Sequence, residues 1–140
     1  MSFAFCPTPP DAPIYLSGPA PMHHTAAWRA ATQALQAQFP GVPIWSATDV
    51  FRSRAEWRHR LVTRLSDCGA LVFLADGDGW IGKGVDTEIA AARGVGLAVG
   101  WLMPGGVLLA IHDVELGTPD ETDWAHYRRV RPIGAAEVSP

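Results

Sequence analysis

Gly-Ala-Leu-Val-Phe-Leu-Ala, residues 69–75, is the stretch that decides the fold. Its continuous apolar run, without alternation, is typical of a strand buried on both faces of a parallel sheet. The segment before it, Arg54–Ser66, places Trp57, Leu61, Val62 and Leu65 on one face of a helix. The sequence therefore predicts a helix that leads into a central parallel strand.

The same alternation extends in both directions from this strand. Further short apolar runs predict strands at residues 13–18, 42–45, 97–102 and 107–111, and helical spacing predicts helices at residues 25–38 and 85–93. Alternating strands and helices favour an α/β domain over residues 13–111: a flavodoxin/Rossmann-like, five-stranded parallel sheet with helices on both faces.

The two ends of the chain differ from this domain in composition. Residues 1–12 contain three prolines and are expected to form a flexible leader. Residues 112–140 are more polar, with a possible short helix at Trp124–Arg131. We expect this C-terminal extension to close a site or to contact a neighbouring subunit.

Composition excludes several classes of function. The 140 residues are 48% hydrophobic and 18% charged, with a net charge of -3, which fits one folded domain rather than a disordered chain. An acidic chain of pI 5.9 has no electrostatic footprint for a nucleic acid polymer or an anionic membrane. No apolar run approaches a membrane span, and the N-terminus has no secretory pattern, so we expect a cytoplasmic protein. Cys6 and Cys68 are too few for a disulfide framework, and Cys68 is expected to be a small buried residue.

The glycine-rich loop after residues 69–75 is a candidate anion site. Gly77–Gly84 nearly matches the pattern G-x-x-x-x-G-K-[ST], but Gly84 replaces the hydroxyl residue that holds magnesium. The backbone N–H groups of Gly82, Lys83 and Gly84 could still bind an anion at the start of the next helix. The alternative is a glycine-rich turn with a solvated lysine.

Acidic and aromatic residues near this loop each allow two interpretations. Asp86 and Glu88 fall in or near the first helical turn, where they could complement the helix dipole or supply a catalytic carboxylate. Trp45 and Trp80 lie at strand ends, where an indole could stack on a nucleobase or cover the core. The histidine pair at 23 and 24 has no partner at metal-ligand spacing, and no metal site is expected.

Three segments together resemble a known superfamily. They are Ile-Tyr-Leu-Ser-Gly-Pro at residues 14–19, Asp67 just before the central strand, and Gly84-x-x-x-Glu88-Ile89-Ala90-x-Ala92. In order and spacing they are similar to the nucleoside 2-deoxyribosyltransferase-like superfamily, which includes nucleoside 5'-monophosphate N-glycosidases. The resemblance covers residues 14–102.

The resemblance implies roles for particular residues. Glu88 matches the nucleophile that attacks C1' of the sugar, and Tyr15 matches the tyrosine that orients it through a hydrogen bond. Gly18 matches the turn that lies against the substrate, and Asp67 matches an acidic residue whose role is structural. The chemistry needs no cofactor, and members of the family assemble as homodimers or larger oligomers.

Two positions depart from the family pattern. His59 stands where many members have an aspartate, and Gly82 stands where transferases have Asp and phosphate-recognising hydrolases have Ser. Because Glu88 and Tyr15 do match the family pattern, the resemblance implies that these two residues are catalytic. The residues expected to bind the substrate are Gly18, His59, Trp80, Gly82, Lys83, Gly84 and Asp86.

The expected function is cleavage or transfer of the glycosidic bond of a nucleoside or nucleoside 5'-monophosphate. Two features favour a phosphorylated substrate and hydrolysis: Lys83, and the absence at Gly82 of the aspartate that transferases have. One alternative is a non-catalytic nucleotide-binding or sensing module of the same fold. Another is an interaction protein that uses the segment after His112, in which Asp123, Trp124 and Tyr127 are the residues of interest.

Overall fold

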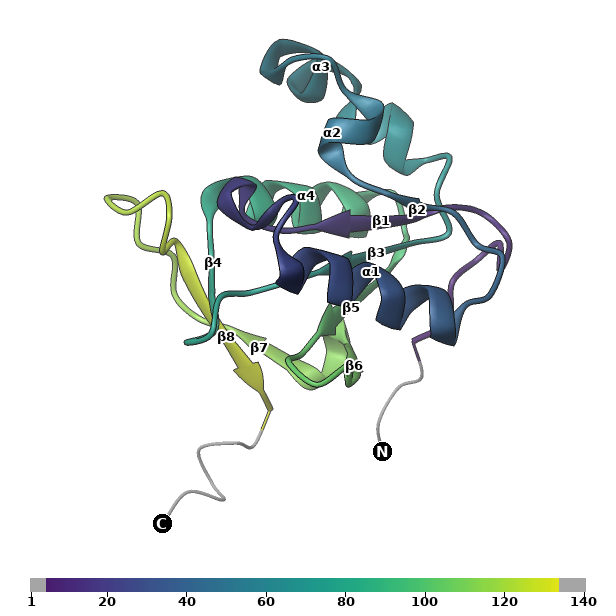
Figure 1. Ribbon diagram of the computed structural model, residues 1–140. Helices are drawn as coiled ribbons and strands as arrows, with labels where there is room; N and C mark the ends of the chain where they lie inside the picture. The colour runs from purple at the N-terminus through teal and green to yellow at the C-terminus, as the bar shows by residue number, and fades with distance from the viewer. Residues whose placement is uncertain (1–4, 134–140) are drawn as a thin grey trace.

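A five-stranded sheet forms the centre of the molecule in the computed structural model, which describes residues 5–133 (Figure 1). Its strands in spatial order are β2 (Ile44–Trp45), β1 (Ile14–Ser17), β3 (Ala70–Phe73), β5 (Ala98–Leu102) and β6 (Leu108–Ala110). The first four are parallel to their neighbours, and β3, the strand predicted to be central, lies in the middle of the order.

The edge strand β6 corrects the expectation of an all-parallel sheet, because it pairs with β5 in the antiparallel direction. The connection between these strands is a tight turn in which Gly105 and Gly106 both have a φ of 92°. Such a short connection can join only antiparallel neighbours, since a parallel pair needs a crossover of a dozen or more residues.

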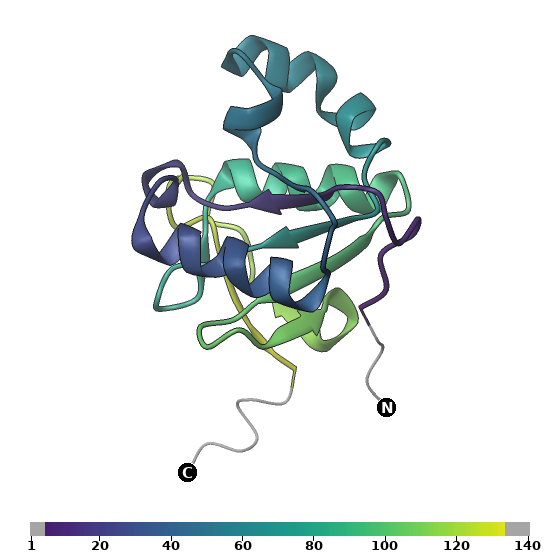
Figure 2. The same ribbon diagram turned by 45° about the vertical axis from the view of Figure 1, so that its right-hand side comes forward.

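Helices cover both faces of this sheet (Figure 2). α1 (Ala26–Gln38) lies on one face, and α3 (Arg54–Leu65) and α4 (Lys83–Gly94) lie on the other. Three short helices, η1 (Ala20–Met22), α2 (Ala47–Val50) and η2 (Ile111–Asp113), complete the helical elements of the described chain.

The predicted helix ends are largely correct. α1 has the predicted N-cap, since the Thr25 side chain accepts a hydrogen bond from the Trp28 amide. α3 is capped in the same way by Ser53, which accepts from the Glu56 amide. α4 begins two residues earlier than predicted, at Lys83, with Gly82 as its N-cap.

Strand alternation divides the interior into two hydrophobic clusters. On β1, Ile14 and Leu16 face α1 and pack with Leu35, whereas Tyr15 faces α3 and α4 and packs with Ile89. All four residues of β3 are buried, which confirms that this strand is covered on both faces. Cys68 is also buried, as predicted, and burial raises the pKa of its thiol to about 12.

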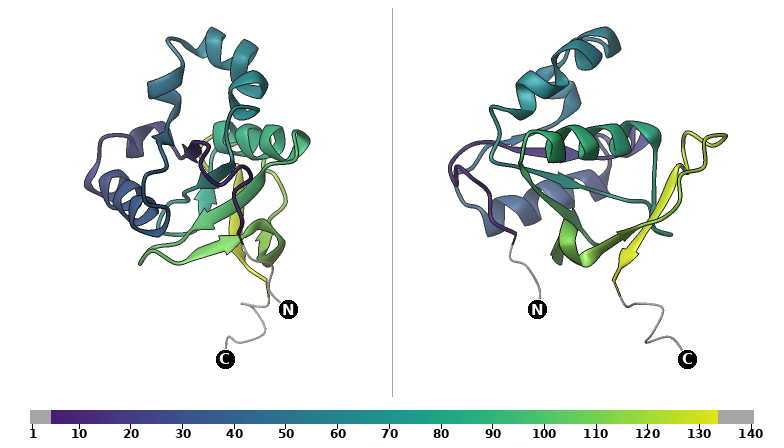
Figure 3. Two further views of the ribbon diagram at one scale, coloured as in Figure 1. Left: turned by 90° about the vertical axis from the view of Figure 1, so that its right-hand side faces the viewer. Right: turned by 180° about the vertical axis from the view of Figure 1, so that it is seen from behind.

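A second, three-stranded antiparallel sheet joins the loop between β3 and α4 to the C-terminal segment, in the order β4 (Trp80–Ile81), β8 (Arg128–Pro132) and β7 (Val114–Leu116). The prediction of a helix at Trp124–Arg131 is therefore wrong. In β8, Val130 is buried between the exposed Arg129 and Arg131, which is the two-residue period of a strand. Figure 3 shows this C-terminal part beside the start of α4.

The proline-rich segment, expected to be loose, contacts the domain in its described part. The Thr8 amide donates to the Gly69 carbonyl at 2.9 Å, and Phe5 makes an edge-on contact with Phe39. Residues 1–4 lie outside the described residues. Within residues 5–133, no helix is both long and apolar enough to cross a membrane.

Candidate active site

Glu88 is the one charged residue that is buried among residues 5–133, with 5% of its surface exposed. Its carboxylate is held by three donors. Tyr15 Oη donates to Oε2, Trp57 Nε1 donates to Oε2 at 2.9 Å, and Ser17 Oγ donates to Oε1 at 2.6 Å. A buried carboxylate is costly unless it is hydrogen-bonded, and here the donors come from two separate elements, β1 and α3.

Local periodicity brings these groups to one point. Tyr15 and Ser17 are two residues apart on β1, so both side chains lie on the face that α4 covers. Glu88 is at the start of the second turn of α4, next to the buried Ile89, which agrees with the expected position in or near the first turn. Ser17 is the last residue of β1, so the site lies at the carboxyl end of that strand, where ligands bind in sheets of this kind.

Burial controls the proton equilibria of the cluster. Desolvation raises the pKa of Glu88 above its ordinary value, although the hydrogen bonds from Ser17, Tyr15 and Trp57 act in the opposite direction. Burial, followed by the nearby carboxylate, raises the pKa of Tyr15 far above its usual range. Tyr15 therefore keeps its proton at neutral pH and acts as a donor that orients Glu88.

The arrangement has the parts that covalent catalysis by a carboxylate requires. Oε2 accepts two hydrogen bonds from described side chains, whereas Oε1 accepts one. A carboxylate oxygen can accept two, so Oε1 keeps a lone pair that could attack an electrophilic carbon. Fixed donors hold the carboxylate in a single orientation, which favours reaction with a positioned substrate.

The C-terminal segment engages Lys83, one of the three residues of the predicted anion site at the start of α4. The Lys83 amide donates to the Trp124 carbonyl at 2.8 Å, and Lys83 Nζ donates to the Tyr127 hydroxyl at 3.2 Å. A Cβ atom on Gly82 would lie 3.0 Å from the same Trp124 carbonyl, so this glycine permits the close approach of the C-terminal segment. The expectation of three open backbone donors was therefore wrong for Lys83, because the chain's own C-terminal segment occupies that donor.

Asp86 is likewise engaged with the C-terminal segment. Its Oδ1 lies 2.8 Å from Arg128 Nε in a largely buried ion pair. Its expected role in substrate binding has no support in these contacts. Gly84 is exposed, and nothing lies within 4 Å of the position its Cβ would take.

The remaining predicted residues, His59, Trp80 and Gly18, make no side-chain hydrogen bond to Glu88. His59 is exposed on α3 and makes no hydrogen bond to Glu88. Trp80 lies in β4 and meets His126 edge-on, with 5.7 Å between ring centroids, so it acts as part of the second sheet. A Cβ on Gly18 would lie 2.8 Å from Trp28, which explains the glycine by packing.

Sequence reasoning missed two of the three donors. The sequence could have identified Ser17 as a donor, because strand alternation places its side chain on the same side of β1 as Tyr15. Trp57 was interpreted as a core residue, and it does pack against the core, but its indole nitrogen binds Glu88. Helical periodicity identifies a buried face and does not identify which polar atom that face meets.

Glu88 does not line any of four cavities on the described part of the chain, the largest of which is about 1000 Å³. Within residues 5–133, no group of three or more His, Cys, Asp and Glu side chains is placed to hold a metal ion. The fold and site thus define an α/β domain with a buried, hydrogen-bonded glutamate at the end of its first strand. No family model, curated protein or solved structure matches the chain.

Proposed function

We propose that the protein is an N-glycosidase-like enzyme that cleaves or transfers the glycosidic bond of a nucleoside or nucleoside 5'-monophosphate. The proposal places the chain in the nucleoside 2-deoxyribosyltransferase-like superfamily, with a flavodoxin/Rossmann-like fold. It rests on one observation: a buried Glu88 carboxylate that Tyr15, Ser17 and Trp57 orient at the carboxyl end of β1.

In the proposed reaction, Glu88 Oε1 forms a bond to C1' of the sugar while the bond from C1' to the base nitrogen breaks. The electron pair of that bond leaves with the base, which takes up a proton, and a covalent glycosyl-enzyme remains. Water or a second base then attacks C1' while the bond from C1' to Glu88 Oε1 breaks, which restores the carboxylate. The attacking group loses a proton to solvent, and the product is the free sugar with water or a new nucleoside with a base. Tyr15 holds the other oxygen, Oε2, throughout.

Substrate entry requires a local opening, because Glu88 is 5% exposed. Trp57 is the half-buried residue beside the carboxylate, and it belongs to α3, which projects with α2 from the body of the molecule (Figure 1). Movement of α3 would carry the Trp57 indole away from Oε2 and uncover Glu88. The proposed enzyme therefore works through an opened state of this helix.

The direct test is incubation of the purified protein with a panel of nucleosides and nucleoside 5'-monophosphates, followed by chromatography for free base. The wild type should release base from at least one compound, and Glu88→Gln should release none. Glu88→Gln is the matched variant because its amide oxygen can accept from Tyr15 and Trp57 while its amide nitrogen donates to Ser17. An unaffected Glu88→Gln variant would show that another residue is the nucleophile.

A second candidate is a non-catalytic nucleotide-binding or sensing module of the same fold. The observation that favours it is the burial of Glu88, which raises the pKa of the carboxyl and opposes the ionised form that a nucleophile needs. This candidate predicts that a nucleotide raises the melting temperature while the panel yields no free base.

A homodimer or larger assembly remains part of the proposal, and light scattering on the purified protein measures it. The segment after His112 is the part of the chain expected to contact a neighbouring copy. A monomer at micromolar concentration would remove this part of the proposal and leave the proposed chemistry of Glu88 unchanged.

A further inference from the structure

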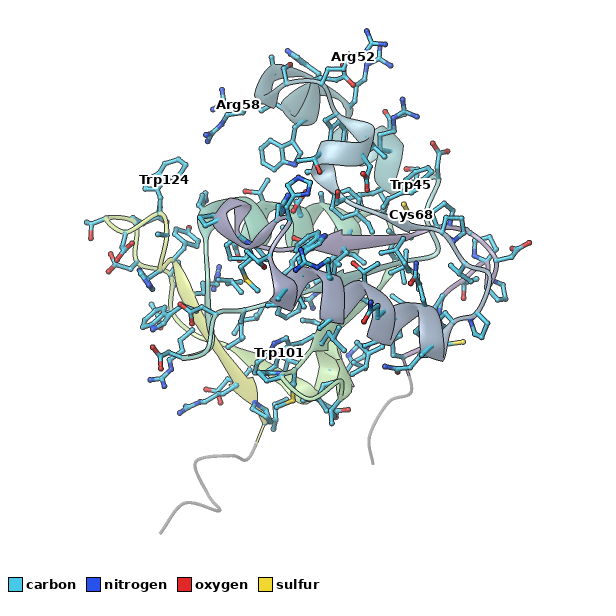
Figure 4. The ribbon with its side chains drawn as sticks, viewed as in Figure 1. Trp45, Arg52, Arg58, Cys68, Trp101 and Trp124 are labelled. Carbon is cyan, nitrogen blue, oxygen red and sulfur yellow. The ribbon has the colours of Figure 1, made fainter. Side chains whose placement is uncertain are left out.

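A cavity of about 1000 Å³ lies between α2 and α3, apart from the Glu88 cluster. Three arginines line it: Arg52 in the link between the two helices, and Arg60 and Arg64 one turn apart on α3. Figure 4 shows Arg52 at the outer end of this projecting unit. The volume is at the upper end of the range found for small-molecule sites.

The three guanidinium groups have no partner in the described chain. Arg52, Arg60 and Arg64 take part in none of the ion pairs among residues 5–133. Their side chains also make no hydrogen bond to any described group. Residues 52–64 hold five of the ten arginines of a chain whose net charge is -3, and one carboxylate, Glu56. Positive charge is therefore concentrated on this unit, and its donors are unused.

The rest of the lining indicates what kind of anion would fit. Asp49 and Glu56 also line the cavity, and Asp49 Oδ2 is engaged with Ser46 while Oδ1 accepts no hydrogen bond from described residues. These carboxylates suit hydroxyl donors on a ligand. Trp45 supplies a half-buried indole, which suits the face of a ring. A purely inorganic anion would leave these three groups without a role.

We propose that this cavity binds an organic phosphate that carries a hydroxylated ring, which is the chemistry shared by sugar phosphates and nucleotides. Arginine forks bind phosphate oxygens in pairs, so Arg60 and Arg64 hold the phosphate together with Arg52. The hydroxyl groups donate to Asp49 and Glu56, and the ring packs on Trp45. The proposal does not depend on catalysis by Glu88, since the three side chains that donate to Glu88 do not line this cavity.

The test is calorimetric titration of Glu88→Gln protein, in which bond cleavage cannot consume the ligand. The probes are ribose 5-phosphate and AMP, with ribose and adenosine as their phosphate-free counterparts. The variant pair Arg60→Gln/Arg64→Gln removes the cavity charges. The pair Arg54→Gln/Arg58→Gln is its matched control, because it removes the same charge from the same helix at positions that do not line the cavity. Arg58 points away from the body of the molecule in Figure 4.

At least one phosphate probe should bind tenfold or more tightly than its phosphate-free counterpart. The Arg60/Arg64 pair should lose at least tenfold in affinity, and the Arg54/Arg58 pair should stay within about threefold. Arg60→Gln alone, on an exposed residue, should show an intermediate loss, which separates binding from any folding defect at the half-buried Arg64.

Three outcomes would overturn the proposal. The first is that neither phosphate probe binds more tightly than its counterpart. The second is an equal loss in both arginine pairs, which would indicate diffuse attraction to a basic surface. The third is binding that neither pair alters, which would place the ligand elsewhere. In the third case the proposed function would still stand, and base release by the wild type would test it separately.

Discussion

Two neighbouring parts of helix α4 satisfy their polar groups in different ways. At the start of the helix, Lys83 and Asp86 contact the C-terminal segment through Trp124, Tyr127 and Arg128. One turn further, Glu88 is bound by side chains of β1 and α3. The first region joins two parts of the fold at its partly exposed surface, whereas the second holds an ionisable carboxyl group inside the core. A polar residue on a helix predicted to carry the active site can therefore simply hold another segment of the chain. Burial of a polar group among several hydrogen-bond donors indicates a candidate active site more reliably.

The largest expected effect is that of Glu88→Ala. Glu88 is 5% exposed, so its side chain is lost from the core and not from the surface of a helix start. Alanine leaves the Tyr15, Ser17 and Trp57 donors without an acceptor and opens a void, which should lower the free energy of unfolding by about 2–4 kcal/mol. Urea denaturation measures this loss. Glu88→Gln should stay within about 1 kcal/mol of wild type, and an equal loss in both variants would contradict the hydrogen-bond argument.

Tyr15→Phe should have the next largest effect. It keeps the buried ring and removes the hydroxyl donor to Glu88, at a cost of about 1–2 kcal/mol in the free energy of unfolding. Because the Tyr15 hydrogen bond lowers the pKa of Glu88, its removal should also raise that pKa further. The pH at which stability levels off should therefore move upward, which a mere packing change would not cause. A profile that superimposes on that of the wild type would remove Tyr15 from its orienting role.

The pH dependence of stability tests the raised pKa of Glu88 directly. Between the ordinary carboxyl pKa near 4.5 and the raised folded value, the folded protein keeps a proton that the unfolded chain has lost. Stability due to this group is therefore full below the ordinary pKa and falls as pH rises through the interval, by up to about 1.4 kcal/mol per pH unit. Denaturation curves across pH 4 to 8 should show this fall in wild type relative to Glu88→Gln. Parallel curves for the two proteins would contradict it.

The smallest effect is expected at the start of α4. Arg128→Gln leaves the largely buried Asp86 carboxylate without its cation, and should lower the free energy of unfolding by about 1 kcal/mol. Hydrogen exchange should then speed up in β8 and at the start of α4, while the amides around Tyr15 and Ser17 keep their protection. If both regions lose protection together, the contact between α4 and the C-terminal segment and the buried Glu88 cluster form one cooperative unit. The contrast between the two regions would then not hold.

Local pattern determined much of the sheet and part of the site. Apolar runs identified β1, β3 and β5, and helical spacing with a capping threonine identified α1. The resemblance in residues 14–19 and 84–92 paired Tyr15 with Glu88, and that hydrogen bond is present. Local sequence patterns did not predict the second sheet, because β4 has only two residues and Ile81 pairs with Arg128 of β8, 47 positions later.

The sequence by itself determined which faces of the elements are apolar, since strand and helix periods are set by backbone geometry within a few residues. It thereby determined that Tyr15 and Ser17 share one side of β1. Only the tertiary structure decided that Trp57, 31 residues from Glu88, is the third donor, and that the C-terminal segment covers Lys83 and Asp86. It also decided that Arg52, Arg60 and Arg64 line one cavity without partners. These contacts depend on how separate elements pack in three dimensions, and the burial that sets the pKa of Glu88 arises from the same packing.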